Sequence, residues 1–229
     1  MKIIFLNAWQ GQIPKIKNFI LENIPTTDIF CFQESFNSKS QIFCLDLLED
    51  YQYFFDEKRV SKQDQFINCT FIRKNFSVLD IKTIGQGDST IGLGLFTKIK
   101  ISDNKFINLC NFHGHARPGD KQDNPNRIKQ SQLIIDFFKD LSGPKIIGGD
   151  FNLDLNIKSV QMFEDNGYKN LIKEFKIPTT RNEISWSKYE NKQLFADHLF
   201  VSPGIKITNF SVPNNKISDH LPLILEFKI

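Results

Sequence analysis

Short apolar segments of strand length recur along this whole chain, and they constrain its fold more than any other feature. Several of them alternate apolar with polar residues, which is typical of strands in a sheet with one face in water. A chain with so many strands must bury sheets against each other and against helices. The predicted strands cover residues 2–7, 28–35, 51–55, 66–72, 76–84, 91–101, 105–113, 145–150, 194–202, 205–212 and 221–229.

Fewer segments have the apolar spacing of a helix, and these fall between the predicted strands. Helices are predicted over residues 13–24, 128–141 and 156–165. A further helix is predicted to begin at an N-cap, Asn37 or Ser38, and to run through Leu48. The apolar face predicted for the 128–141 helix consists of Ile128, Leu133, Ile134, Phe137, Phe138 and Leu141.

The polar stretches between these elements are predicted to be connections within one domain. Residues 115–127 contain two prolines and a glycine, so they predict a loop, and residues 167–193 predict an irregular polar region. The sequence has no low-complexity segment and no linker composition. We therefore predict an α/β fold in one domain over residues 1–229, with two mixed β-sheets and flanking helices.

Composition and charge exclude few function classes. The formal net charge is +3, which permits an anionic substrate but does not demand a nucleic acid. Cys31, Cys44, Cys69 and Cys110 form no C-x-x-C pair and are predicted to be buried free thiols. Signal-peptide features are missing, and no apolar run approaches the ~20 residues that cross a bilayer. We expect a cytoplasmic protein without a membrane span, and a monomer.

Polar side chains recur at the ends of the predicted strands. The clearest case is KIIGGDFN, in which an apolar strand ends in two glycines and is followed by an acid and an amide. All four histidines of the chain lie in or beside such segments. The candidate site residues are Asn7, Glu34, His113, Asp150, Asn152, Asp197, Asp219 and His220.

These residue types suit the hydrolysis of a phosphodiester by water. The reaction needs charge neutralisation at the phosphoryl oxygens, an activated in-line water and help for the leaving oxygen. Mg²⁺ prefers oxygen ligands and keeps several waters, so Glu34 and Asp219 could hold it. A zinc site would need clustered nitrogen or sulfur ligands, and only Asp-His pairs occur here.

The remaining candidates fit the other parts of this chemistry. His113 and His220 could donate hydrogen bonds to the phosphate, and Asp150 could orient or deprotonate the water. Asp197 could hold a histidine ring and favour the imidazolium. Gly148 and Gly149 would let backbone and ligand come close.

Two other enzyme classes lack their signatures. A serine hydrolase would need a nucleophile elbow such as G-x-S-x-G, which is absent. The glycine-rich segment 85–94 has no G-K-[ST], so strand turns explain it better than a P-loop does.

Six motifs, LNAW, FQES, NFHGH, GGDFN, DHLFVS and SDHLP, occur in this order between residues 4 and 222. In order and spacing the chain resembles the endonuclease/exonuclease/phosphatase superfamily, which includes exonuclease III-like AP endonucleases, DNase I, deadenylases, inositol polyphosphate 5-phosphatases and neutral sphingomyelinases. The resemblance implies a four-layer α/β sandwich with the site at one edge. It also implies a Mg²⁺- or Mn²⁺-dependent phosphoester hydrolase.

The resemblance also implies roles for the matching residues. Its metal side would consist of Glu34, Asn7 and Asp219, with Glu34 as the main ligand. Asp150 matches the aspartate that activates water, and Asp197 matches the one that orients the final histidine. The positions that contact phosphate are His113, Asn152 and His220.

Departures from the superfamily pattern narrow the function. AP endonucleases usually have a tyrosine in a Y-x-P-N context where this chain has NFHGH, which argues against repair of abasic sites. His198 stands where a tyrosine is common and is predicted to be structural. Arg117, Arg127 and Arg181 are further candidates for contacts to substrate anions.

The leading hypothesis is a phosphodiesterase or nuclease that acts on DNA, RNA or a nucleotide-like diester. The alternative is a phosphatase or phosphodiesterase for a small phosphorylated molecule or a lipid headgroup. Nucleic-acid binding should depend strongly on salt, because each phosphate contact releases counterions. A binding module without catalysis is a third hypothesis, although every matched catalytic position is filled.

Overall fold

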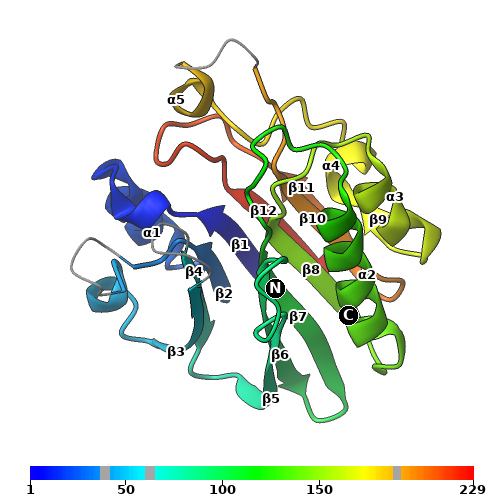
Figure 1. The fold of residues 1–229 in the computed structure, drawn as a ribbon. Helices are drawn as coiled ribbons and strands as arrows, with labels where there is room; N and C mark the ends of the chain where they lie inside the picture. Colours follow the sequence, from blue (N-terminus) through cyan, green and yellow to red (C-terminus); the bar gives the residue numbers. More distant parts are fainter. Residues whose placement is uncertain (37–41, 60–64, 188–191) are drawn as a thin grey trace.

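The structure is a computed structural model that describes residues 1–36, 42–59, 65–187 and 192–229 (Figure 1). Its strands form two six-stranded sheets. The first sheet has the order β11-β12-β1-β2-β4-β3 and consists of β1 (Lys2–Asn7), β2 (Ile29–Gln33), β3 (Tyr51–Arg59), β4 (Gln65–Arg73), β11 (Lys206–Ser211) and β12 (Leu223–Lys228). The second has the order β5-β6-β7-β8-β10-β9 and consists of β5 (Ser77–Ile84), β6 (Leu93–Ser102), β7 (Lys105–His113), β8 (Lys145–Asp150), β9 (Lys169–Asn170) and β10 (Asp197–Val201).

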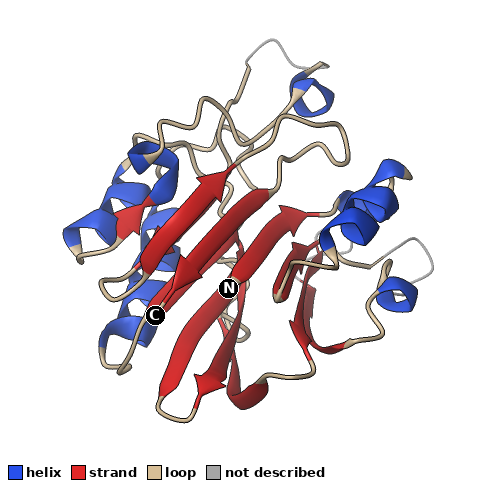
Figure 2. Ribbon diagram, turned by 180° about the vertical axis from the view of Figure 1, so that it is seen from behind, coloured by secondary structure: helices blue, strands red, loops and turns tan. Residues whose placement is uncertain are grey.

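Both sheets are mixed, as the sequence predicts. The pairs β1–β2 and β7–β8 are parallel, and the other pairs are antiparallel. Helices lie on the outer sides of the strands (Figure 2). Within the described residues they are α1 (Lys15–Asn23), α2 (Pro125–Lys139), α3 (Lys158–Asp165), α4 (Leu171–Glu174) and α5 (Glu183–Trp186), with 3₁₀ turns at Trp9–Gly11 and Leu45–Leu47. The predicted α/β sandwich of two packed mixed sheets is therefore confirmed.

Strand β1 shows why the fold has four layers. Its side chains alternate between two apolar clusters. Ile3 and Phe5 belong to the core between the sheets, whereas Ile4 and Leu6 pack in a second core that includes residues of α1. A third core joins the outer face of the second sheet to α2 and α3. Strands that are buried on both faces read as continuous apolar runs, which is why the sequence located them well.

A polar cluster lies between the two sheets, just behind the strand ends that hold the candidate site. The amide of Asn111 donates to the carbonyl oxygens of Phe32 and Cys69, both at 3.1 Å. Gln33 donates to Asn111 Oδ1 at 2.5 Å. Asn68 donates to the carbonyl oxygens of Leu93 and Asn111 at 2.7 and 3.2 Å. These bonds join β2 and β4 of one sheet to β6 and β7 of the other.

The helix predicted to run through Leu48 is wrong where the structure describes it. Its predicted caps, Asn37 and Ser38, lie outside the described residues. From Ile42 onward the chain has a single 3₁₀ turn, and Ile42 forms an isolated bridge with Phe36. Phe43, Cys44 and Leu48 are buried in the core shared with α1, so tertiary packing overrides the helical spacing.

Helix α2 begins at Pro125, three residues before the predicted start. Asn124 caps it by accepting a hydrogen bond from Arg127 N at 3.0 Å, and a proline suits the first helical position. The predicted apolar face is also partly wrong, because Leu133 is 37% exposed. The buried face instead consists of Arg127, Gln130, Ser131, Ile134, Ile135 and Phe138.

The region predicted as irregular, residues 167–193, contains short regular elements. Asn170 and Asn182 cap α4 and α5 through their side chains, and β9 pairs with β10. All four cysteines are buried and free, as predicted. Within the described ranges, no helix combines the length and the apolar character needed to cross a bilayer.

Candidate active site

Strand register brings the candidate residues to one edge of the sandwich. Asn7 ends β1, and its partner in β2 is Gln33, directly before Glu34. In the second sheet, Asp150 pairs with His113 on the parallel strand β7 and with Asp197 on the antiparallel strand β10. Parallel strands end at the same edge of a sheet, and an antiparallel neighbour begins there. Each sheet therefore supplies part of the site.

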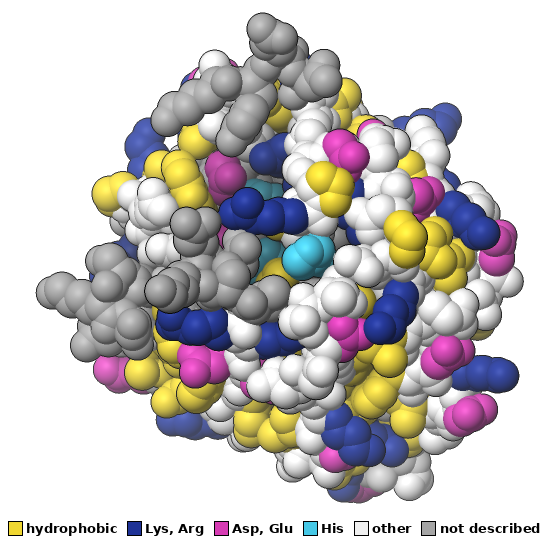
Figure 3. Space-filling view, viewed as in Figure 1, with side chains coloured by type: hydrophobic (Ala, Val, Ile, Leu, Met, Phe, Trp, Pro, Cys, Tyr) yellow, Lys and Arg dark blue, Asp and Glu magenta, His cyan; other side chains and the backbone are white. Residues whose placement is uncertain are grey.

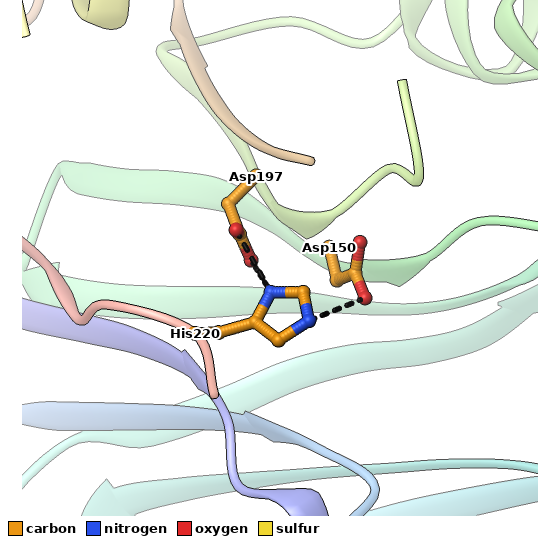
Figure 4. A group of neighbouring side chains, drawn as sticks. All are labelled: Asp150, Asp197 and His220. Carbon is orange, nitrogen blue, oxygen red and sulfur yellow. Dashed lines mark hydrogen bonds and ion pairs between the residues drawn. The ribbon is translucent and has the colours of Figure 1, made fainter. Parts of the chain in front are cut away.

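The loop before β12 places His220 between two carboxylates (Figure 4). Its Nδ1 lies 2.9 and 3.0 Å from the two carboxylate oxygens of Asp197. Its Nε2 lies 3.7 Å from Asp150 Oδ2 and 3.9 Å from Asp219 Oδ2. Burial alone would lower the pKa of His220, but Asp197, Asp150 and Asp219 outweigh it and raise that pKa to about 9. His220 is therefore an imidazolium at neutral pH.

Asp150 is the most connected acid of the site. Asn7 Nδ2 donates to Asp150 Oδ2 at 3.0 Å and to Glu34 Oε1 at 3.1 Å. His113 Nε2 lies 3.8 Å from Asp150 Oδ2 and 3.9 Å from Glu34 Oε1. Burial would raise the pKa of Asp150, but His220, His113 and Lys121 lower it below its usual value. The side chain is therefore a buried carboxylate held by several donors.

The two glycines before Asp150 have a different purpose from the one predicted. A Cβ on Gly149 would lie 2.1 Å from the carbonyl oxygen of Phe112, and φ at this glycine is +133°. A Cβ on Gly148 would meet Leu199 Cδ1 at 2.6 Å and Phe5 at 2.9 Å. The glycines thus make room for neighbouring strands and for the facing sheet. Close approach of a ligand is not what requires them.

Asn152 sits beside Asp150 in a left-handed backbone conformation, with φ at 55°. Its backbone N–H donates to Asp150 Oδ1 at 2.9 Å. Its Nδ2 donates to the carbonyl oxygen of Gly114 at 3.0 Å, and its Oδ1 accepts from Lys121 Nζ at 2.5 Å. Left-handed backbone in a non-glycine residue is uncommon and clusters at functional sites. Glu34, with φ at 50°, is a second example here.

Lys121 lies at this site although it is not among the candidate site residues predicted from the sequence. It is only 6% exposed although it lies in the polar loop between β7 and α2. Its charge reaches the candidate site: burial lowers its pKa, and Asp150 and Asp197 both raise it. A lysine within a run of mixed charges has no sequence pattern that reveals such burial.

The three candidate arginines have separate positions. Arg127 is fully buried, and its guanidinium donates to Asp120 Oδ1 at 2.7 Å and to the carbonyl oxygens of Pro118 and Gln122. The prediction that Arg127 contacts substrate is therefore wrong, since its side chain is used to hold the loop. Arg181 forms a backbone bridge with His220 at the edge of the site. Arg117 is exposed in the loop between β7 and α2.

The residues that could hold a metal divide into two groups. Ligand atoms of Asp150, Asp197 and His220 lie within 4.8 Å of one another. In this group, however, His220 Nδ1 already lies 2.9 Å from Asp197 Oδ2, and a histidine must be neutral to ligate a metal. Glu34 and Asp219 have the more accessible acidic side chains, 28% and 20% exposed. Carboxylate oxygens are the ligands that a hard divalent cation prefers.

The side-chain oxygen of Asn7 does not serve as a metal ligand in this structure, because it is already hydrogen-bonded. Asn7 Oδ1 accepts a hydrogen bond from Trp9 N at 3.0 Å, and the amide nitrogen faces Glu34 and Asp150. Asn7, a predicted metal ligand, instead donates hydrogen bonds to two acids.

His198 is structural, as expected: its Nε2 lies 3.0 Å from the carbonyl oxygen of Leu153, and burial lowers its pKa to about 4. It is therefore neutral.

Solved structures share this fold over the whole chain. An endonuclease/exonuclease/phosphatase from Bacteroides vulgatus has a TM-score of 0.78 at 20% identity, and the alignment covers 100% of this chain and 98% of that one. The human Nocturnin catalytic domain with bound sulfate anion has a TM-score of 0.76 at 18% identity, covering 100% and 94%. A Bacteroides thetaiotaomicron mannosyl-6-phosphatase has a TM-score of 0.72 at 16% identity, covering 100% of each chain. At such identities the likeness shows the fold alone.

Sequence comparison settles the family. No curated protein matches the whole sequence significantly. The model of the Endonuclease/Exonuclease/phosphatase family matches residues 6–220, a span that includes Asn7, Asp150 and His220. The chain belongs to the Endonuclease/Exonuclease/phosphatase family, whose members are phosphoester hydrolases.

Proposed function

We propose that this chain is a divalent-metal-dependent phosphoester hydrolase in which an activated water attacks phosphorus in line. One observation carries the proposal: a buried, ionised Asp150 has Asn7 at 3.0 Å, His220 at 3.7 Å and His113 at 3.8 Å from the same carboxylate oxygen. A carboxylate held by donors on several sides is suited to orienting a water and accepting its proton.

His220 supplies a positive charge beside the carboxylate of Asp150. Asp197 occupies Nδ1, so the Nε2–H of the imidazolium points toward Asp150 and the space beside it. There it can donate to a phosphoryl oxygen and stabilise the charge that develops during attack. Asn152, fixed by Lys121 and Gly114, has a second amide N–H that can donate to the same group.

Glu34 and Asp219 would hold the metal in this proposal. When bound, a divalent cation neutralises charge on the phosphoryl and leaving oxygens. Asn7 keeps Glu34 and Asp150 at a fixed separation by donating to both. This division leaves Asp150 for the water and Glu34 for the metal, and Mg²⁺ or Mn²⁺ is the expected ion.

The test uses p-nitrophenyl phosphate and bis-p-nitrophenyl phosphate with Mg²⁺, with Mn²⁺ and with EDTA. Wild type is expected to hydrolyse at least one substrate in a metal-dependent way. Asp150→Asn keeps the shape and removes the base, so it should lower kcat/KM roughly 10²–10⁴-fold. Asp103→Asn is a matched control, because that side chain is 98% exposed. Turnover that persists in EDTA, or in Asp150→Asn, would contradict the proposal.

Two substrate classes share this chemistry. A diester such as DNA or RNA remains the first hypothesis from the sequence, and a small phosphorylated molecule is the second. Cleavage of a nucleic acid should weaken steeply with salt, because each phosphate contact releases counterions. Hydrolysis of a small molecule should depend on salt far less. The buried cations described next favour the second class.

A further inference from the structure

Lys121 is a buried cation that no carboxylate neutralises directly. Its side-chain nitrogen donates to the neutral amide oxygen of Asn152 at 2.5 Å. In the part of the chain that the structure describes, Lys121 forms no ion pair with an acid. An ammonium group has three N–H donors, and burying a charge without a close partner is costly. A lysine in this position has donors left for an anion.

Arg181 is a second buried cation that forms no ion pair with an acid among the described residues. It is 9% exposed, and its Nη1 donates to Gln193 Oε1 at 3.2 Å. Its Nε is buried and has no hydrogen-bond partner among the described residues. Gln193 in turn donates to the carbonyl oxygen of Gly119 at 2.6 Å, two residues from Lys121. The arginine is thereby tied to the loop that holds the lysine.

The two cations repel each other. The charge of Arg181 lowers the pKa of Lys121, in addition to the larger effect of burial, whereas Asp150 raises it. Two buried like charges that form no ion pair among the described residues lower stability, and clefts lined by one sign of charge attract ligands of the other sign. Figure 3 shows histidine side chains beside a Lys or Arg side chain in a recess on this face.

The fold holds Lys121 in place through a second buried arginine. Arg127 fastens the loop by its contacts to Pro118, Asp120 and Gln122. The carbonyl oxygen of Lys121 accepts from Asp154 N at 2.8 Å, which ties the loop to the segment that carries Asn152. Lys121 itself has φ at 60°. An ammonium group that is fixed in advance loses little entropy when it binds a ligand.

We propose that Lys121 and Arg181 form a cationic subsite that binds a terminal phosphate group in its dianionic form, so that phosphomonoesters are preferred over internal diesters. This inference rests on the proposed function and deepens it by naming the substrate class. A diester carries one negative charge on two free oxygens, whereas a monoester carries close to two on three free oxygens at neutral pH. The further oxygen and charge give the two cations a ligand that a diester lacks.

The test compares monoester with diester hydrolysis in Lys121→Met and Arg181→Gln. A charge-assisted hydrogen bond corresponds to roughly a 10- to 100-fold change in affinity. Lys121 also fixes Asn152, which both substrates would contact, so the diester rate can fall as well. Each variant should therefore lower kcat/KM for p-nitrophenyl phosphate by about that factor more than it lowers kcat/KM for bis-p-nitrophenyl phosphate. Lys121→Arg keeps the charge and should retain most of the monoester rate. Lys139→Met, an exposed lysine on α2, is the matched control.

A binding measurement separates this proposal from the proposed function. Inorganic phosphate is titrated into each variant with Mg²⁺ by calorimetry, and its Kd should weaken about 10-fold or more in Lys121→Met and Arg181→Gln. If wild type hydrolyses neither substrate, the proposed function fails, and the phosphate titration still decides the subsite. Equal losses on monoester and diester would mean that Lys121 only orients Asn152. That result, or unchanged phosphate affinity, would overturn the subsite.

Discussion

Replacing Asp197 with asparagine should move the pH at which the enzyme loses activity. Asp197 is the strongest of the charges that raise the pKa of His220 from 6.5 to about 9, against the opposing effect of burial. Each pKa unit corresponds to about 1.4 kcal/mol, so the net stabilisation of the imidazolium is about 3 kcal/mol. Asparagine keeps the size of the side chain and removes the charge. The pKa of His220 should then fall to its ordinary value or below it.

The consequence can be expressed as a fraction of protonated His220. At pH 8 about 90% of the wild-type ring is protonated, whereas a ring with an ordinary pKa is protonated to about 3%. Asp197→Asn should therefore lower kcat/KM about 20-fold more at pH 8 than at pH 6. The alkaline limb of the profile should move from near pH 9 to pH 6.5 or lower.

The assay is the pH dependence of kcat/KM on whichever p-nitrophenyl ester wild type hydrolyses. An NMR titration of the His220 ring gives the pKa without any turnover. A loss in Asp197→Asn that is equal at pH 6 and pH 8 would refute the reasoning, because Asp197 would then only orient the ring.

The raised pKa of His220 also makes the stability of the fold depend on pH. The folded pKa is raised, so the stabilisation is complete below pH 6.5 and is lost as the pH rises through about 9.

Two further predictions concern the backbone and the metal. Gly149→Ala should lower the free energy of unfolding by about 3 kcal/mol or more, because the new Cβ would lie 2.1 Å from the Phe112 carbonyl oxygen; a urea unfolding curve that matches wild type would contradict this. Mg²⁺ at about 100 times its Kd should stabilise wild type by about 2.7 kcal/mol and raise its Tm. In Glu34→Gln, Mg²⁺ should raise the Tm much less than it does in wild type. An equal rise of Tm in both proteins would show that Glu34 is not a metal ligand.

The sequence predicted the strands well and the helix surfaces poorly, for a physical reason. A strand such as β8 is apolar because both its faces are buried, so its own residues reveal it. The buried face of α2 depends on distant groups. Gln130 Oε1 accepts hydrogen bonds from Gly92 N and His115 N, both at 3.0 Å. A polar residue satisfied in this way can be buried, and apolar spacing cannot anticipate it.

The same distinction applies to the candidate site: some of its residues are predictable from the local sequence, and others are not. Asp150, Asp197 and His220 were predictable, because each interrupts or adjoins an apolar run where a polar residue is unexpected. The burial of Lys121 was not, since it arises from Arg127 and Asp154, which bind its loop from other parts of the chain. Local sequence reports which residues end a strand. It does not report which loops fold back onto that end.

The polar cluster between the sheets has a consequence for how the site can vary among proteins of this fold. Apolar contacts are not directional, whereas a hydrogen bond requires a defined distance and angle. The Asn111 amide therefore adds a constraint on how the two sheets are aligned, because it donates to the carbonyl oxygens of Phe32 and Cys69 across the interface. Asn7 and Glu34 on one sheet thus keep their distance from Asp150 on the other. The loops above are then free to diversify, since the alignment of the reacting groups is secured beneath them.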